Sequence, residues 1–180
     1  MVSLLFVFWM YVILFAVIGA MRGWAKELLV SFSVTLALAL NFLLRKYIPI
    51  ITIIPAIPPP GETPYLFWLR TIIVIALVYF GYQTVMSIQR LAARAARERL
   101  VDTLFGLVMG GFNGYLIAGT IWFYLHDAGY PFPNVISAPQ GDIAEIVRRM
   151  MIWMPPHLLG EPGIYFAVIL AFIFVLVVYI

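Results

Sequence analysis

Long apolar runs separated by short polar segments are the dominant pattern of this sequence. Five such runs occupy residues 2–20, 28–44, 66–83, 104–125 and 163–180. Each is close to the roughly 20 residues that an α-helix needs to cross a bilayer. Because lipid cannot satisfy backbone polar groups, spanning runs of this kind form helices. The pattern predicts an all-α, polytopic membrane bundle with two helical hairpins and a fifth C-terminal transmembrane helix.

The turn between the first two runs is a short charged segment, residues 19–27. It reads Gly-Ala-Met-Arg-Gly-Trp-Ala-Lys-Glu and is too short to hold a soluble domain. The two runs are therefore expected to fold back on each other as an antiparallel hairpin. Glu27 is expected at the boundary of the second helix, where the positive end of the helix dipole favours an anion.

Composition supports a membrane location and limits the kinds of functional site that we expect. Hydrophobic residues make up 64% of the 180 residues, and charged residues only 11%, against about 25% in a soluble domain. The net charge of +3 comes from clustered Arg and Lys, a pattern typical of membrane orientation and not of nucleic-acid binding. With no cysteine and two histidines, we expect no metal site, no cofactor and no catalytic residues. The first cation, Arg22, follows the first run, which favours a retained helix over a cleaved signal peptide.

Three connecting segments are expected to lie at the membrane surface. Residues 47–65 hold six prolines, which favours an extended segment along the interface. Arg90, Arg94 and Arg97 form one helical stripe beside Arg99, which predicts a basic amphipathic helix on an anionic leaflet. The stripe serves equally well as a plain topology determinant. Asp142–Met154 is expected to be an amphipathic helix whose Met-rich face packs on the bundle or the membrane, or alternatively binds a partner.

Polar residues inside the runs have mostly local interpretations. The side chains of Ser31, Ser33, Thr35 and Asn41 are expected to bond backbone carbonyls or a neighbouring helix. Arg70 is expected to extend to the headgroups, because no acid is predicted at a matching depth. His126 and Asp127 are expected to lie just outside the fourth span. Because none of the apolar runs has an ionisable residue near its centre, we do not expect the protein to couple transport to protons or ions.

The fourth run carries small residues every fourth position, at Gly106, Gly110, Gly114 and Ala118. In lipid, such a face lets two helix backbones approach closely. We expect it to face the first or second run of the same chain. Gly111, about 100° away around the helix, is expected to point elsewhere.

Two segments together resemble a family of bacterial inner-membrane proteins, the colicin V production proteins. The first is Gly19-x-x-Arg22-Gly23 followed by Lys26-Glu27-Leu28, similar to the family's first hairpin turn. The second is similar to its fourth helix, and it reads Arg99-Leu100-x-x-x-Leu104-x-Gly106-x-x-x-Gly110 with Gly114. The resemblance covers residues 2–155 and ends with a serine, an amphipathic stretch and a proline, here Ser137, 143–154 and Pro155.

The sequence departs from the family in two places. Asn113 stands where a basic residue is frequent, and the run at 163–180 lies beyond the usual four-helix core. The resemblance therefore divides the chain into a core at 1–155 and an extra helix at 156–180. It implies a non-enzymatic protein that supports toxin export and envelope processes through partners, and it supplies no catalytic residues.

Two other functions remain open from the sequence. The chain could be an accessory or assembly subunit of a respiratory or photosynthetic complex, with the extra helix and the proline-rich segment as docking surface. It could also be a small channel or transporter, with the Gly-rich fourth helix lining a pore. In each case the expected partners are the anionic leaflet and other membrane proteins or further copies of this chain.

Charge predicts the orientation in the inner membrane. Residues 21–27 and 89–103 carry six cations on one side: Arg22, Lys26, Arg90, Arg94, Arg97 and Arg99. The other side carries Arg45, Lys46, Arg148 and Arg149, with Arg70 if it reaches the headgroups. Because cytoplasmic segments hold the excess of Lys and Arg, the N-terminus is expected outside and the C-terminus inside.

Overall fold

The computed structural model describes residues 3–47, 64–87 and 99–179, and all its elements are helices. Most of the extended segment expected at 47–65 and the stripe of Arg90, Arg94 and Arg97 lie outside these residues, and the described ends of that segment belong to helices. The long helices are α1 (Leu4–Arg22), α2 (Trp24–Tyr47), α4 (Pro64–Ser87), α6 (Arg99–Asp127) and α9 (Gly163–Tyr179). Two short helices, α7 (Asp142–Met151) and α8 (Pro155–Leu158), connect α6 to α9. The all-α class predicted from the apolar runs is confirmed.

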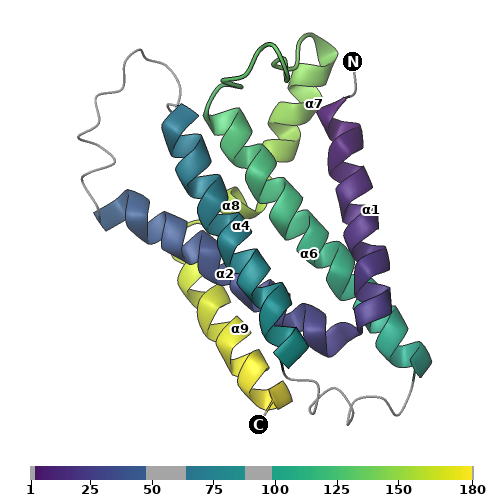
Figure 1. Cartoon of the computed structure of the whole chain (residues 1–180). Coiled ribbons are helices and arrows are strands. Elements are labelled where there is room, and N and C mark those ends of the chain that lie inside the picture. The colour runs from purple at the N-terminus through teal and green to yellow at the C-terminus, as the bar shows by residue number, and fades with distance from the viewer. Residues whose placement is uncertain (1–2, 48–63, 88–98, 180) are drawn as a thin grey trace.

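Four of the described helices are long and apolar enough to cross a membrane: α1, α2, α4 and α6. The chain is therefore a multi-pass helical membrane protein. Helix α9 is wholly apolar but has only 17 residues, fewer than the four candidate spans. A fifth crossing thus stays a prediction. Helix α1 begins at one end of the bundle and α9 finishes at the other (Figure 1).

The helices pair differently from the two expected hairpins. Helix α1 packs mainly against α6, and α2 packs against α4, α6 and α9, whereas α1 and α2 touch little. Antiparallel order is visible in the contacts, since Gly19 meets Gly106 while Val12 meets Gly114. A short turn between two runs fixes their opposite directions but leaves the choice of packing partner to their side chains. Here the small residues select α6 as the partner of α1.

Close backbone contact between α1 and α6 is the tightest feature of the bundle. A Cβ atom added to Gly110 would lie 2.8 Å from the Cα of Gly19, and one added to Gly114 would lie 2.8 Å from the Cβ of Phe15. The structure thus places Gly106, Gly110 and Gly114 against α1, and Ala118 lines a groove between the same two helices. Gly111 does not point away as expected, because its added Cβ would lie 3.5 Å from the Cβ of Ala16.

A single glycine forms the corner between α1 and α2. Gly23 has a φ of +88°, a conformation that glycine adopts without steric cost. The carboxylate of Asp102 on α6 fills the space where a side chain would be, and it accepts a hydrogen bond of 3.1 Å from the backbone N–H of Trp24. Asp102 therefore stabilises the start of α2.

Helix α2 is the central element of the bundle, with half of its span buried inside the protein. Its apolar residues Val30, Val34 and Ala37 are fully buried and belong to one core with residues of α4 and α6. A second core forms where α7 meets the start of α1. There Val147, Met151 and Met154 pack with Phe8 and Trp122, so the Met-rich face packs on the bundle. Helix α7 ends at Met151, three residues before the expected end.

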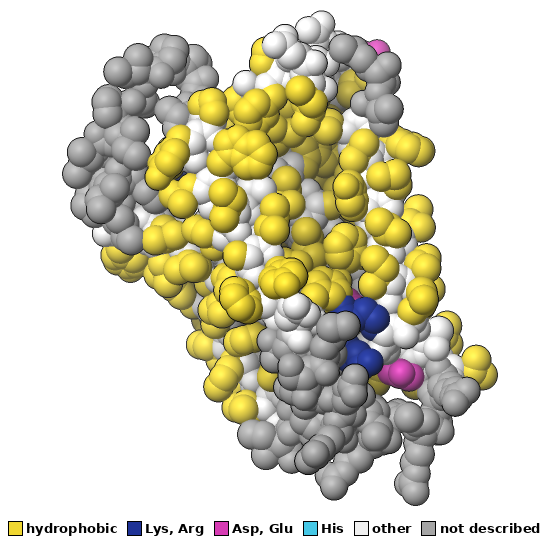
Figure 2. All heavy atoms as spheres, viewed as in Figure 1, with side chains coloured by type: hydrophobic (Ala, Val, Ile, Leu, Met, Phe, Trp, Pro, Cys, Tyr) yellow, Lys and Arg dark blue, Asp and Glu magenta, His cyan; other side chains and the backbone are white. Residues whose placement is uncertain are grey.

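The surface of the bundle is apolar. Hydrophobic side chains cover most of the helical face shown in Figure 2, and the charged side chains visible there gather mainly near the corner between α1 and α2. Large side chains such as Phe6, Ile13 and Phe80 are more than half exposed. A soluble protein rarely leaves so much apolar surface uncovered. Contact with lipid tails accounts for this surface.

The glycine contact predicts that Gly110→Ala and Gly111→Ala have opposite effects on stability. Each change gains roughly 1 kcal/mol of helix propensity, so propensity cancels in the comparison. At Gly110 the new methyl group meets backbone atoms, and such overpacking costs about 1–3 kcal/mol. At Gly111 the methyl group makes an ordinary contact. Thermal aggregation in detergent should show Gly110→Ala aggregating at a lower temperature than Gly111→Ala, and equal temperatures would contradict the α1–α6 contact.

Candidate functional site

A buried carboxylate lies at the centre of the strongest polar cluster in the described bundle. Glu27, in the first turn of α2, has 0% of its surface exposed. Its Oε2 accepts a hydrogen bond of 2.9 Å from the amide Nδ2 of Asn113, which also donates to the Glu27 backbone oxygen at 2.8 Å. Ser31 donates to the Asn113 Oδ1 at 2.6 Å. The amide of Asn113 is thereby fixed between α2 and α6.

A guanidinium and a phenol complete the surroundings of Glu27. Arg22 Nη1 lies 3.4 Å from Glu27 Oε1, and the Arg22 guanidinium stacks 4.2 Å above the ring of Tyr82. The Tyr82 hydroxyl donates to Glu27 Oε2 at 3.5 Å. We call Arg22, Glu27, Ser31, Tyr82 and Asn113 the Glu27 cluster. Since a buried carboxylate is costly unless it is paired and hydrogen-bonded, these partners make its burial tolerable.

The Glu27 cluster joins all four candidate spans. Arg22 ends α1, Glu27 and Ser31 belong to α2, Tyr82 to α4, and Asn113 is the middle residue of α6. Glu27 lies in the first turn of α2, as expected, but its side chain is enclosed by the neighbouring helices, which the sequence did not predict. The sharp corner at Gly23 and the close α1–α6 contact carry the start of α2 alongside the middle of α6.

The Glu27 carboxylate is enclosed, and two of its partners are only partly buried. Glu27 and Asn113 are fully buried, whereas the Arg22 side chain is 20% exposed and Tyr82 is half-buried. Among the described residues, no group of three or more His, Cys, Asp or Glu side chains lies close enough to hold a metal ion. The chemistry that the cluster offers is thus charge pairing and proton exchange at one carboxylate.

A second polar cluster lies at the other end of α2. Arg70 donates from Nη1 to Asp127 Oδ2 at 3.1 Å, and its guanidinium lies 3.8 Å from the ring centre of Tyr124. Arg45 Nη1 lies 3.6 Å from the same Asp127 oxygen, and Asn41 donates to the Arg70 backbone oxygen at 3.3 Å. These five residues form the Arg70 cluster. The Arg70 side chain is only 12% exposed and is paired with Asp127, so the expectation that no acid lies at a matching depth was wrong.

The remaining polar predictions have simple outcomes. Ser33 and Thr35 donate to the backbone oxygens four residues earlier, at 3.0 and 2.8 Å, which confirms the local role of the hydroxyls. His126 lies within α6, with its Nδ1 3.3 Å from the Tyr130 hydroxyl. Burial raises the pKa of Tyr130 above its ordinary value, and a hydrogen bond from Trp122 opposes this shift.

The sequence-predicted surface cations are only partly brought together. Arg22 faces Glu27, and Lys26 is half-buried on the first turn of α2. Arg99 is the first residue of α6, while Arg90, Arg94 and Arg97 fall outside the described ranges. Sequence reasoning had assigned no role to Tyr82 and treated Asn113 only as a departure from a family. An amide in the middle of an otherwise apolar helix was the available signal for Asn113.

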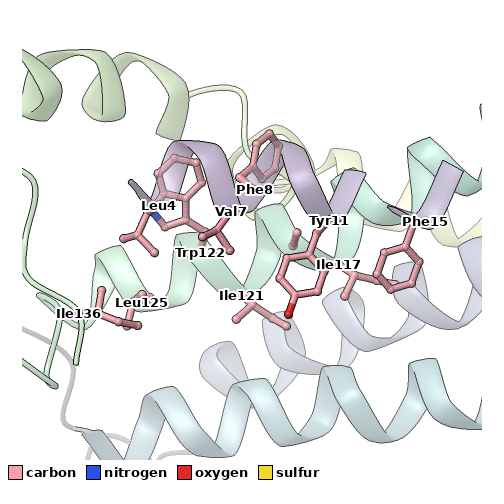
Figure 3. Close-up of a pocket in the computed structure, with 11 residues that line it drawn as sticks. Leu4, Val7, Phe8, Tyr11, Phe15, Ile117, Ile121, Trp122, Leu125 and Ile136 are labelled. Carbon is pink, nitrogen blue, oxygen red and sulfur yellow. The ribbon is translucent and has the colours of Figure 1, made fainter. Parts of the chain in front are cut away.

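A groove between α1 and α6 offers space without polar chemistry. It measures about 320 Å³, and apart from the Tyr11 hydroxyl and the Trp122 indole its walls are aliphatic and phenyl side chains (Figure 3). The labelled side chains come from both helices and from Ile136 in the connection to α7. Such a groove suits hydrocarbon, and it holds no group for catalysis.

Comparison with protein-family models, with curated proteins and with solved structures finds no match for this chain. Its membrane character rests on the four candidate spans.

The geometry of the Glu27 cluster predicts strong coupling between Glu27 and Asn113. Asn113→Leu removes the amide that donates to the buried carboxylate, and a hydrogen bond to a charged group contributes about 1.5–3 kcal/mol. Thermal unfolding in detergent should therefore show a clear loss of stability. Adding Glu27→Gln should cost less in the Asn113→Leu background than in the wild type, because the hydrogen bond between the two side chains is already gone in that background.

Thr120→Val is the matched control for Asn113→Leu. Thr120 lies on the same helix, is also fully buried, and its hydroxyl makes no hydrogen bond with the described residues. This change should leave stability unchanged or higher. Strictly additive losses for Glu27→Gln and Asn113→Leu would show that the two side chains do not interact.

Proposed function

We propose that the chain is a non-enzymatic inner-membrane protein of the colicin V production type, which supports secretion or envelope processes through partner proteins. One observation carries this proposal. The two segments that carry the resemblance lie about 80 residues apart in the sequence, yet they contact each other in the bundle. Gly19 meets Gly106 and Gly110, and Gly23 meets Asp102.

The contact between the two segments supports treating them as one structural unit. Each motif alone consists of common residues. When the Arg-Gly turn packs on the glycine face, however, the same close contact between helices requires both motifs. The departure at Asn113 falls on the same unit. Where the resemblance leads us to expect a basic residue, a neutral amide donates to Glu27, and Arg22 supplies the positive charge.

The alternative of a pore lined by the Gly-rich helix loses its main support. The face formed by Gly106, Gly110 and Gly114 is covered by α1 and is not available to line a channel. One observation favours a different transport function, however. Glu27 is a buried carboxylate beside the middle of α6, and intramembrane carboxylates often mark proton paths. Proton-coupled transport through the Glu27 cluster is thus the second candidate.

Complementation tests the proposed function directly. In a bacterial strain that lacks its own colicin V production protein, expression of this chain should restore export of the toxin, because the shared unit would engage the same partners. Gly111→Ala should restore export equally, since its methyl group fits the bundle. The measurement is secreted toxin activity at matched membrane levels of each variant.

Two results would contradict the proposal. One is no export despite a folded, membrane-inserted chain. The other is proton flux through liposomes that contain only this purified chain, abolished by Glu27→Gln at unchanged folded yield. The second result would favour proton-coupled transport.

A further inference from the structure

The Arg70 cluster borders a cavity that the proposed function does not use. The cavity measures about 390 Å³ and lies where the end of α2, the start of α4, the end of α6 and the segment from α8 to α9 meet. Its polar lining comes from Asn41, Arg45, Arg70 and His157, and its apolar lining includes Leu38, Phe42, Phe123, Leu159 and Ile164.

The lining of this cavity suits an anion. The described residues that line it include two arginines and one histidine and no carboxylate. Asp127 lies beside the cavity and holds both guanidiniums, at 3.1 Å from Arg70 and 3.6 Å from Arg45. The ring of Tyr124 supports the face of the Arg70 guanidinium. Guanidinium groups held in place this way present paired N–H donors that match the oxygens of a phosphate.

An apolar groove continues from the cavity between α2 and α9. It measures about 300 Å³, and Phe42 and Ile164 line both spaces. Further along, the groove is lined by Leu36, Ala39, Leu40, Leu43, Tyr165, Val168 and Ile169. The two spaces together therefore offer a cationic end and a hydrocarbon end joined by two shared side chains.

The position of the cavity also agrees with the level of lipid headgroups. Arg45 lies in the last turn of α2, Asp127 ends α6, and Arg70 lies within the first two turns of α4. Basic pockets between the ends of membrane helices are suited to acidic lipid headgroups. Lys46, next to Arg45, is paired with Glu161 at 2.6 Å and ties the end of α2 to the segment before α9.

From these observations we propose that the chain holds one anionic phospholipid, with its phosphate on Arg45 and Arg70 and an acyl chain in the groove between α2 and α9. Charge complementarity selects the headgroup, and the adjoining groove selects a lipid over a free anion. This site is independent of the Glu27 cluster and of the export function.

Native mass spectrometry of the purified full chain can measure this binding. The probes are dioleoyl-phosphatidylglycerol, dioleoyl-phosphatidylcholine and inorganic phosphate, each titrated separately. We expect one phosphatidylglycerol per chain, retained at least tenfold more tightly than phosphatidylcholine, and no comparable retention of inorganic phosphate. Equal affinity for the two lipids would overturn the charge-selective site, and equal retention of inorganic phosphate would overturn the lipid as occupant.

Variants locate the site on the chain. Arg45→Gln should weaken phosphatidylglycerol binding about tenfold or more, and it should fold, because the Arg45 side chain is 63% exposed. Arg148→Gln is the matched control, since it removes the same charge from the exposed face of α7, and it should change binding less than twofold. Equal losses for the two variants would show general attraction to a basic protein and would overturn the site.

A variant in the groove tests the hydrocarbon end. Ala39→Leu adds volume where the acyl chain is placed, so it should weaken binding of dioleoyl-phosphatidylglycerol while Arg45 remains in place. Elution as a single folded species in size-exclusion chromatography is required for each variant. Unchanged affinity in folded Ala39→Leu would overturn the placement of the acyl chain.

Discussion

Backbone contact between α1 and α6 is the constraint on which the rest of the bundle depends. Lipid tails give no hydrophobic driving force between helices, so close approach of small residues and interhelical hydrogen bonds must hold the bundle together. Gly19 and Gly110 supply that approach, and the added Cβ distances of 2.6–2.8 Å between them leave room for no side chain. With α1 held this close, Gly23 turns the chain so that α2 starts against α6, where Asp102 receives the Trp24 N–H.

Two polar clusters follow from this placement and tie the helices at separate points along α2. Near its start, Glu27 meets Asn113 of α6 and Arg22 of α1. Near its end, Asn41 bonds the backbone of α4. Because an unpartnered polar group in hydrocarbon costs several kcal/mol, each contact disfavours sliding of one helix along another. The two clusters therefore fix how far each helix is displaced along its neighbours, which contacts between apolar surfaces alone do not determine.

The sequence predicted the features that depend on neighbouring residues. Run lengths located the candidate spans within a few residues, and the hydroxyls of Ser33 and Thr35 bond the preceding turn as expected. Periodicity also identified the glycine face of α6 as a packing surface. It could not name the partner, because a face of small residues fits any helix that offers another.

Features that join distant segments were missed for a physical reason. Asp127 pairs with Arg70 across 57 positions of sequence, and Glu27 reaches Asn113 across 86. The depth of Glu27 depends on how α2 leaves the corner at Gly23, which no local pattern encodes. Arg22 was assigned to the membrane surface because its charge, read without Glu27 and Tyr82, had no other explanation.

Disulfide trapping tests the α1–α6 contact most directly, because the chain contains no cysteine of its own. The Cβ positions of residues 16 and 111 lie 3.5 Å apart, within the range that a disulfide bridges. The pair Ala16→Cys with Gly111→Cys should form an intramolecular disulfide in native membranes under mild oxidation. The control pair, Ala16→Cys with Phe112→Cys, places the second cysteine about 100° further around α6 and should not. Equal cross-linking of both pairs, or none at 16 and 111, would contradict the contact that organises this protein.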